Sequence, residues 1–219
     1  MEEMLKKVKD NWGLVIPFVT CLILLRLSPM MYDGWYGSSY YYNEGGVINW
    51  IRYVLIFERN NLNGRVGSNL ICGIVESIKS EWIVDIVGTL ILVLILYFTL
   101  RLFEIKRTGV SGILYTALII LIPYRVREYV VQIALMQYVM PVLFFTIALD
   151  IHKKYEEDKS YKWFVLLFPL TVMACTWMEN SAVAYGFVMF ILFVKDWYDN
   201  KRVDSKLLFN ILLGAISGL

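Results

Sequence analysis

Residues 82–103 read WIVDIVGTLILVLILYFTLRLF, and this stretch decides the class of fold. It is rich in Leu, Ile and Val, and between Asp85 and Arg101 it contains no charged residue. A helix needs about 20 predominantly apolar residues to cross the hydrocarbon core of a bilayer. The stretch therefore predicts a membrane-spanning helix.

The composition of the whole chain indicates the same class. The chain has 219 residues, 58% of them hydrophobic, and a mean hydropathy of +0.58, whereas soluble domains have about 45–50% apolar residues. Because further apolar runs alternate with short charged clusters, the predicted fold is all-α, a polytopic transmembrane helical bundle forming one membrane domain over residues 1–219. The predicted spans are 12–29, 82–103, 110–123, 130–149, 163–176, 181–194 and 207–219.

The first and last of these runs raise questions about the ends of the chain. A basic segment precedes the run from Trp12 to Leu27, as in a cleaved signal peptide, but Arg26 and Pro29 stand where a small-residue cleavage site is needed. We expect an uncleaved anchor. The last run is still apolar at Leu219, so we expect the sequence to be the truncated N-terminal part of a longer protein and to be inactive on its own.

Residues 30–81 are the longest interruption of the apolar pattern. The segment opens with YDGWYG at 32–37 and continues with two stretches, 47–58 and 65–79, in which apolar and polar residues alternate with helical spacing. We expect two amphipathic helices lying on the membrane surface. Their expected apolar faces include Trp50, Val54, Leu55, Leu70, Ile71 and Ile74, and their expected polar faces include Asn49, Arg52, Ser68 and Asn69.

Basic residues are unevenly divided between the two sides that these spans define. With the N-terminus inside, fourteen of the 21 Lys and Arg fall on inner segments, six fall on the outer side, and Arg26 lies in the first span. Because Lys and Arg collect in cytoplasmic loops, we expect a multi-pass cell-membrane protein with a cytoplasmic N-terminus. The inner residues are Lys6, Lys7, Lys9, Arg101, Lys106, Arg107, Lys153, Lys154, Lys159, Lys162, Lys195, Lys201, Arg202 and Lys206; the outer ones are Arg52, Arg59, Arg65, Lys79, Arg125 and Arg127.

Several function classes are excluded by composition. The net charge of +2 with scattered basic residues argues against a nucleic-acid partner. The three cysteines have no C-x-x-C spacing, and the single histidine, His152, lies in a segment expected to be a charged loop. Nothing therefore requires a metal or a cofactor. The inner segment 152–162, HKKYEEDKSYK, is interpreted as ordinary solvated charge.

Asp33 is the lone acid at the start of the outer loop, between Tyr32 and Gly34 and close to Trp35. One interpretation is that its carboxylate caps a turn that the neighbouring glycine makes possible. The other is that it acts as a base or accepts a hydrogen bond from a sugar hydroxyl just above the membrane, where aromatic rings can stack on the sugar. The same rings are also typical of an interfacial aromatic belt.

Two short predicted spans, 110–123 and 163–176, have implications for the outer turns that follow them. About 14 residues of helix rise about 21 Å, less than a hydrocarbon core of about 30 Å. Their outer ends are expected below the headgroups or in re-entrant segments, around a recess that is open to the outer leaflet. The residues expected to line it are Arg125, Arg127, Glu128, Glu179 and Asn180.

Each of these residues has a functional and a structural interpretation. Arg125 and Arg127 suit a phosphate because a guanidinium presents paired donors, but Arg125 and Glu128 are three residues apart and can pair with each other. An uncompensated charge such as Glu179 costs about 2.5–3.5 kcal/mol at mid-bilayer, which makes it a functional candidate. The alternative is that Glu179 and Asn180 form a water-exposed hairpin turn.

The outer loop resembles a known family. A first span, an acid close behind it in YDGWYG at 32–37, surface helices and an N-G-R turn at 63–65 resemble the N-terminal part of polytopic GT-C-type glycosyltransferases. Bacterial members related to O-antigen glucosyltransferases and to other surface-polymer proteins are the most similar. The resemblance implies a polyprenyl-phosphate-linked sugar donor, transfer on the outer face of the membrane, a saccharide or lipid acceptor, and a role in cell-envelope polysaccharide or glycolipid modification.

The same resemblance assigns roles to residues. Asp33 takes the place of the catalytic acid of the first outer loop, and Arg65 takes that of the basic residue in the G-R turn. Many members have two adjacent acids, whereas here Asp33 is followed by Gly34, so a second carboxylate has to come from elsewhere, with Glu179 as the candidate. The alternative functions are a non-enzymatic transporter or flippase and a membrane assembly subunit.

Overall fold

The computed structural model describes residues 11–27, 47–58, 66–76, 81–121, 138–177 and 179–217. Every element in these residues is a helix, and no strand occurs among them, which confirms the predicted all-α class. The elements are η1 (Trp12–Leu14), α2 (Val15–Leu27), α4 (Val47–Tyr53), η2 (Val54–Glu58), α6 (Val66–Glu76), α7 (Glu81–Leu102), α8 (Gly109–Leu121), α11 (Met140–Asp158), α12 (Tyr161–Trp177), α13 (Glu179–Asn200) and α14 (Ser205–Ser217).

Two of the described helices are long and apolar enough to cross a membrane, judged by length and composition. They are Trp82–Leu102 in α7 and Asn180–Asn200 in α13. The protein buries half of the apolar window in α7 but only 17% of that in α13. The other apolar helices, Trp12–Leu27, Gly109–Leu121, Tyr161–Trp177 and Ser205–Ser217, are shorter.

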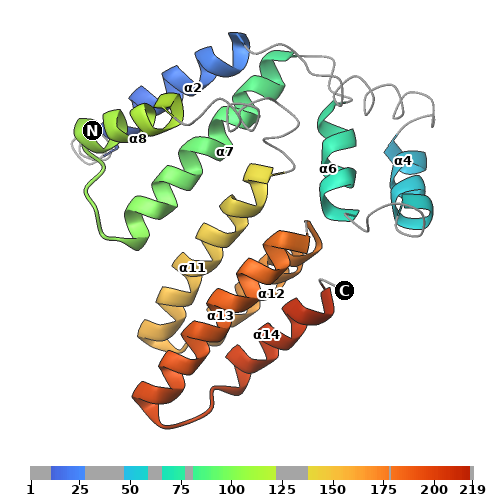
Figure 1. Ribbon diagram of the computed structural model, residues 1–219, viewed down its shortest axis with the longest axis vertical. Coiled ribbons are helices and arrows are strands. Elements are labelled where there is room, and N and C mark those ends of the chain that lie inside the picture. Colours follow the sequence, from blue (N-terminus) through green and yellow to red (C-terminus); the bar gives the residue numbers. More distant parts are fainter. Residues whose placement is uncertain are drawn as a thin grey trace.

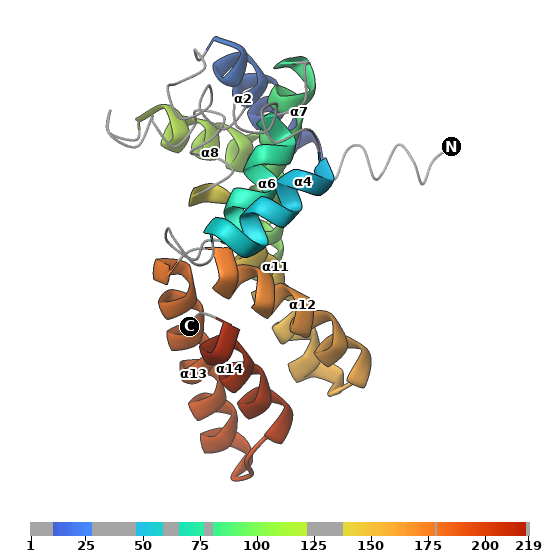
Figure 2. The same cartoon turned by 90° about the vertical axis from the view of Figure 1, so that its right-hand side faces the viewer.

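Helix α11 lies between two groups of helices, with α7 on one side and α12 on the other (Figure 1). Its residue Leu143 joins a core with Cys21, Leu25, Ile91, Leu92 and Ile119 from α2, α7 and α8. Its residues Phe144, Ala148 and Ile151 join a second core with Leu167, Ala174, Cys175, Trp177, Tyr185 and Met189 from α12 and α13. The side view shows α13 and α14 extending away from α2, α7 and α8 (Figure 2).

The helices end at two opposite ends of the bundle. At one, which we call the basic end, the α11–α12 turn lies close to the α13–α14 turn, because Lys159 pairs with Asp196. Lys153 of α11 pairs there with Glu104, just after α7. At the other, which we call the loop end, Arg26 lies 3.6 Å from Asp85. The contacts at the basic end join residues from three of the predicted inner segments, since Glu104 pairs with Lys153 and Lys159 pairs with Asp196.

An ion pair between Arg26 and Asp85 joins α2 to α7 at the loop end. Arg26 Nη1 lies 3.6 Å from Asp85 Oδ2, and its guanidinium also stacks over the Trp82 ring at 4.9 Å from the centroid. Asp85 is fully buried. Because a buried carboxylate without a cation is costly, the pair ties the end of α2 to the start of α7.

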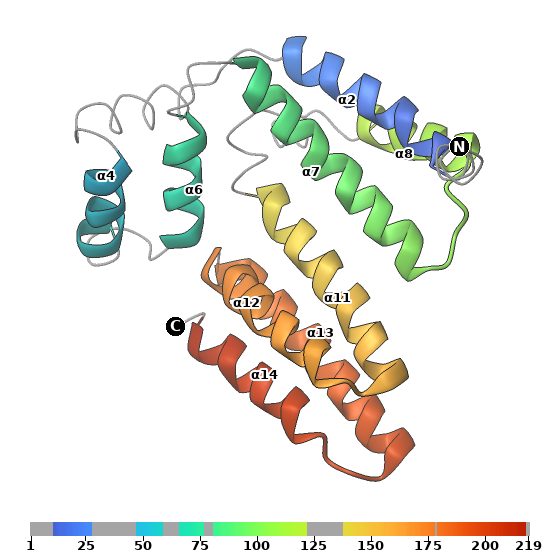
Figure 3. The same ribbon diagram turned by 180° about the vertical axis from the view of Figure 1, so that it is seen from behind.

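The two predicted surface helices lie side by side near the loop end (Figure 3). Trp50 and Val54 are buried, and the indole of Trp50 donates a hydrogen bond to the carbonyl of Leu70 at 3.4 Å. Leu55 of the expected apolar face is 47% exposed, whereas Ser68 of the expected polar face is fully buried against the protein. Helix α6 packs closely on the end of α12 here, since a Cβ at Gly67 would lie 3.3 Å from the Trp177 ring.

Candidate functional site

A pocket of about 350 Å³ opens at the loop end between α11, α12 and α13. Its wall is mostly apolar or aromatic, with Ser181 and Asn180 as polar groups at the start of α13. The Ser181 hydroxyl is already used, since it donates to the Ala174 carbonyl at 2.7 Å, whereas the Asn180 amide is exposed. The lining residues are Tyr138, Pro141, Val142, Phe145, Ala174, Asn180, Ser181, Ala184 and Tyr185.

The structure locates the predicted site residues only in part. Asn180 lines the pocket, and Glu179 begins α13 directly before it, with the side chain of Glu179 outside the described part. The remaining predicted residues, Asp33, Arg65, Arg125 and Arg127, together with Glu128, also lie outside the described residues. Of the residues predicted to line the recess, the described structure thus places only Asn180 at a pocket, and the roles of all of them stay predictions.

A fixed polar network stands behind this pocket. Thr171 of α12, Tyr185 of α13 and Asn210 of α14 are all buried. Tyr185 Oη lies 2.7 Å from Thr171 Oγ1, Thr171 donates to Asn210 Oδ1 at 2.6 Å, and Asn210 Nδ2 donates to Tyr185 Oη at 3.4 Å. With Tyr185 donating to Thr171, the three side chains form a closed ring, and the Thr171 hydroxyl also lies 2.9 Å from the carbonyl of Leu167 on its own helix. Buried polar groups are stable only when they are bonded in this way.

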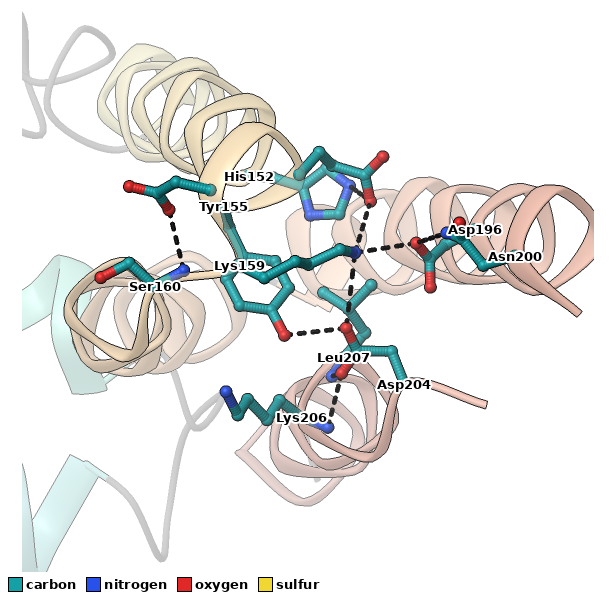
Figure 4. Close-up of polar contacts among 11 residues, drawn as sticks. His152, Tyr155, Lys159, Ser160, Asp196, Asn200, Asp204, Lys206 and Leu207 are labelled. Atoms are coloured by element: carbon teal, nitrogen blue, oxygen red, sulfur yellow. Dashed lines mark hydrogen bonds and ion pairs between the residues drawn. The ribbon is translucent and has the colours of Figure 1, made fainter. Parts of the chain in front are cut away.

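A second polar cluster lies at the basic end and is centred on Lys159 (Figure 4). Its ammonium group donates to Asp196 Oδ1 at 2.8 Å and lies 3.6 Å from Asp204 Oδ2 and 3.7 Å from Glu156 Oε1. Tyr155 donates its hydroxyl proton to Asp204 at 2.8 Å. One lysine thus joins carboxylates from α11, from α13 and from the residue before α14.

The backbone at Lys159 directs this side chain toward the cluster. Lys159 ends α11 with φ 48° and ψ 23°, in the left-handed region, and its N–H donates to the Tyr155 carbonyl. A residue with a Cβ adopts this conformation at a cost of about 1–2 kcal/mol. The charge contacts of the side chain offset that cost, because Asp196 is 4% exposed and needs a cation nearby.

The cluster fixes the protonation states of Lys159 and Asp204. Burial alone lowers the pKa of Lys159, but its hydrogen bond to Asp196 and the nearby carboxylates outweigh burial and raise the pKa above its ordinary value. Burial alone raises the pKa of Asp204, but hydrogen bonds from Tyr155 and from backbone N–H groups outweigh it and lower the pKa. The amine is therefore held charged, so it serves as a clamp rather than as a nucleophile.

His152 and Glu156 lie one turn apart beside Lys159. His152 is 4% exposed; its Nε2 lies 3.5 Å from Glu156 Oε1, and its Nδ1 has no hydrogen-bond partner. Burial lowers the pKa of His152 to about 4, and burial raises the pKa of Glu156. The ring is therefore neutral at pH 7.

These contacts correct the prediction that His152 lies in a solvated loop, whereas Glu157, Asp158, Lys159 and Lys162 of the same segment are exposed as predicted. Helix α11 continues to Asp158, and His152 and Tyr155 are buried. The sequence carried a signal, since His152, Tyr155, Glu156 and Lys159 follow helical spacing and share one face. Their partners Asp196 and Asp204 come from elements distant in sequence, which spacing cannot reveal.

Neither end offers a metal centre within the described residues. No group of three or more His, Cys, Asp or Glu there is placed to hold a metal ion. The chemistry available is hydrogen bonding around Asn180 at the loop end and a charge clamp around Lys159 at the basic end. Comparison of the chain with protein-family models, with curated proteins and with solved structures gives no match.

Proposed function

We propose that the protein is a multi-pass membrane protein with its basic end in the cytoplasm. This proposal rests on the exposed apolar face of α13. Its large apolar side chains are exposed along most of the helix, among them Val183 at 74% and Phe187 at 65%. Soluble proteins rarely expose apolar surface of this extent, whereas a lipid tail is a suitable neighbour for it. The exposed set continues through Phe190, Ile191 and Val194.

Cysteine labelling tests this membrane arrangement. Single cysteines in a background that lacks the native ones are treated in intact cells with a thiol reagent that does not cross membranes. We expect labelling at positions 38–46 and at Asn180, and none at positions 156–160 until the cells are opened. Labelling of 156–160 from outside would contradict the proposed arrangement.

We propose further that the loop end binds a polyprenyl-phosphate-linked sugar and transfers the sugar to an acceptor on the outer face. The pocket beside Asn180 supports this proposal, because its apolar walls suit an isoprenoid chain and its polar rim suits the head of the lipid. Asn180 belongs to the residues that the sequence singled out at this end. The family resemblance of the outer loop supplies the choice of donor.

In the proposed reaction, the acceptor hydroxyl oxygen forms a bond to the anomeric carbon of the sugar. The bond between that carbon and the phosphate oxygen breaks, and polyprenyl phosphate leaves with the electron pair. Asp33 takes the proton of the acceptor hydroxyl. Arg127, Arg125 or Arg65 stabilises the charge on the departing phosphate, and Asn180 hydrogen-bonds the head of the lipid.

Filling the pocket tests where the lipid binds. Ala184→Trp introduces a ring into the pocket, and Val183→Trp introduces the same ring next to it on the exposed side of α13. Binding of undecaprenyl phosphate to the purified proteins in detergent is then compared. We expect Ala184→Trp to weaken binding at least tenfold and Val183→Trp to leave it unchanged, and equal affinities for both variants would refute the pocket assignment.

Replacing Asp33 and Arg127 separates catalysis from binding. Asp33→Asn keeps the size and capping ability of the side chain, so loss of a base predicts a transfer rate about 10²–10⁴ times lower with unchanged lipid binding. Arg127→Gln should weaken undecaprenyl phosphate binding by about 1.5–3 kcal/mol, and the exposed Arg52→Gln by much less. Normal sugar transfer by a correctly inserted Asp33→Asn protein would refute the base role of Asp33. Equal small losses of lipid binding in Arg127→Gln and Arg52→Gln would favour a transporter or an assembly subunit.

A further inference from the structure

A groove of about 520 Å³ runs between α12 and α14 at the basic end. One wall is formed by Tyr161, Phe164, Val165 and Phe168, which follow helical spacing along one face of α12. Phe209 of α14 forms the opposite wall, with its ring centroid 6.1 Å from that of Phe164. From Tyr161 to Phe168 the helix rises about 10 Å, so the apolar wall extends roughly two turns from the basic end.

The groove ends in a cation and a hydroxyl, Lys206 and Ser205. The Lys206 ammonium lies 5.7 Å from the ring centroids of both Tyr155 and Tyr161, which hold it by cation–π attraction. No carboxylate of the described residues lies within ion-pairing distance of it. The nearest acid in sequence, Asp204, is already bonded to Tyr155, to Lys159 and to backbone N–H groups.

We propose that this groove binds an anionic glycerophospholipid. Its phosphate accepts hydrogen bonds from Lys206 and Ser205, and an acyl chain lies along the aromatic wall toward Phe168. The charge pattern favours such an amphiphile, because the groove presents an unneutralised cation at one end and only apolar side chains beyond it. Basic pockets between membrane helices on the cytoplasmic side are suited to anionic headgroups.

This inference rests on the membrane location proposed above, which cysteine labelling tests separately, and it is independent of the sugar-transfer site at the loop end. A helix packed into the groove would need only apolar contacts and would leave the charge of Lys206 unused. A lipid from the inner leaflet uses both the charge and the apolar wall.

The headgroup is tested by native mass spectrometry of the purified protein in detergent, titrated with phosphatidylglycerol or with phosphatidylcholine of identical acyl chains. We expect phosphatidylglycerol to bind more tightly than phosphatidylcholine. In Lys206→Gln the affinity for phosphatidylglycerol should fall about fivefold, the effect expected for one basic residue near a membrane surface. Lys201→Gln is the matched control, since Lys201 also lies over a tyrosine ring, that of Tyr198, at the same end but outside the groove.

The acyl-chain position is tested by filling the groove. Val165→Trp should weaken the binding of both lipids. Leu166→Trp should leave the binding of both unchanged, because Leu166 is the adjacent position, has similar exposure and lies outside the groove. Equal losses in Lys206→Gln and Lys201→Gln would overturn the headgroup assignment. Full displacement of phosphatidylglycerol by soluble glycerol 3-phosphate, or dimers that Val165→Trp abolishes, would overturn the lipid assignment. If Val165→Trp fails to fold, the Lys206 comparison decides.

Discussion

Stability below neutral pH should depend on His152, the only histidine in the chain. Burial lowers its pKa in the folded protein to about 4 from an ordinary 6.5. Because the folded state binds the proton less readily than the unfolded state, the stability contribution is complete above pH 6.5. It is lost as the pH falls from 6.5 toward 4. At about 1.4 kcal/mol per pH unit, the loss is on the order of 3 kcal/mol.

The surroundings of the ring determine how cleanly this effect can be measured. The groups that act on His152 are Glu156 on the same helix, Lys159 after it, Lys195 and Asp196 on α13, and Asp204 before α14. Glu156 titrates with the opposite sign, because burial raises its pKa and protonation then favours the folded state. The prediction is therefore a difference in pH dependence between the wild type and His152→Gln.

The assay is unfolding by a denaturing detergent at intervals from pH 7.5 to 4, with the histidine followed by NMR in ¹³C-histidine-labelled protein. A single histidine gives a single titration curve, so its folded pKa is read without assignment. We expect a value near 4 in the folded protein and a smaller loss of stability on acidification in His152→Gln. A histidine that titrates near 6.5, or identical pH profiles for the two proteins, would refute the burial argument.

Three further predictions concern backbone and core positions. Lys201→Gly should be neutral or stabilising within about 1 kcal/mol, because Lys201, like Lys159, has a positive φ, here 54°. Lys159→Gly should instead cost about 1–2 kcal/mol, because it leaves buried carboxylates without a cation. Thermal unfolding compares the stability of the two variants. Asn210→Ala should cost about 1–3 kcal/mol, measured in the same way, because buried Thr171 and Tyr185 each lose a hydrogen bond to the Asn210 amide. Gly112→Ala should lower the melting temperature strongly, since an added Cβ would meet the Gly13 carbonyl at 2.0 Å, while Gly109→Ala, with open space around it, should not.

The apolar runs made most helices predictable, because a long run without charged residues is stable only when it is buried in protein or surrounded by lipid. The region 82–103 differs from helix α7, Glu81–Leu102, by one residue at each end. The charged continuation of α11 was missed, since solvated loops and paired helical charges have the same composition. His152 and Asp196 are buried together because α11 and α13 meet there, a contact between distant parts of the sequence.

The candidate site was predictable to a smaller extent, and for a different reason. Asn180 was singled out as a polar residue between two apolar runs, and it lines the loop-end pocket. The apolar wall of that pocket was not foreseen, because residues such as Phe145 and Ala184 cannot be told from ordinary core by their spacing. The ring of hydrogen bonds behind Tyr185 escaped the same reasoning, since each of its members is a single polar residue on a different helix.

Helices α12, α13 and α14 are held together by hydrogen bonds near the loop end and by ion pairs at the basic end. Both sets of contacts affect how well the loop-end pocket keeps its shape. The ring of Tyr185 forms part of the pocket wall, while its hydroxyl is bonded to Thr171 and Asn210. A shift of α14 along α13 would therefore break buried hydrogen bonds as well as apolar contacts. At the basic end, Lys159 holds α13 and the start of α14 together by charge. Because both ends resist sliding, the pocket is expected to be largely preformed. If it binds the proposed polyprenyl lipid, a preformed pocket lowers the ordering cost of binding the flexible isoprenoid chain.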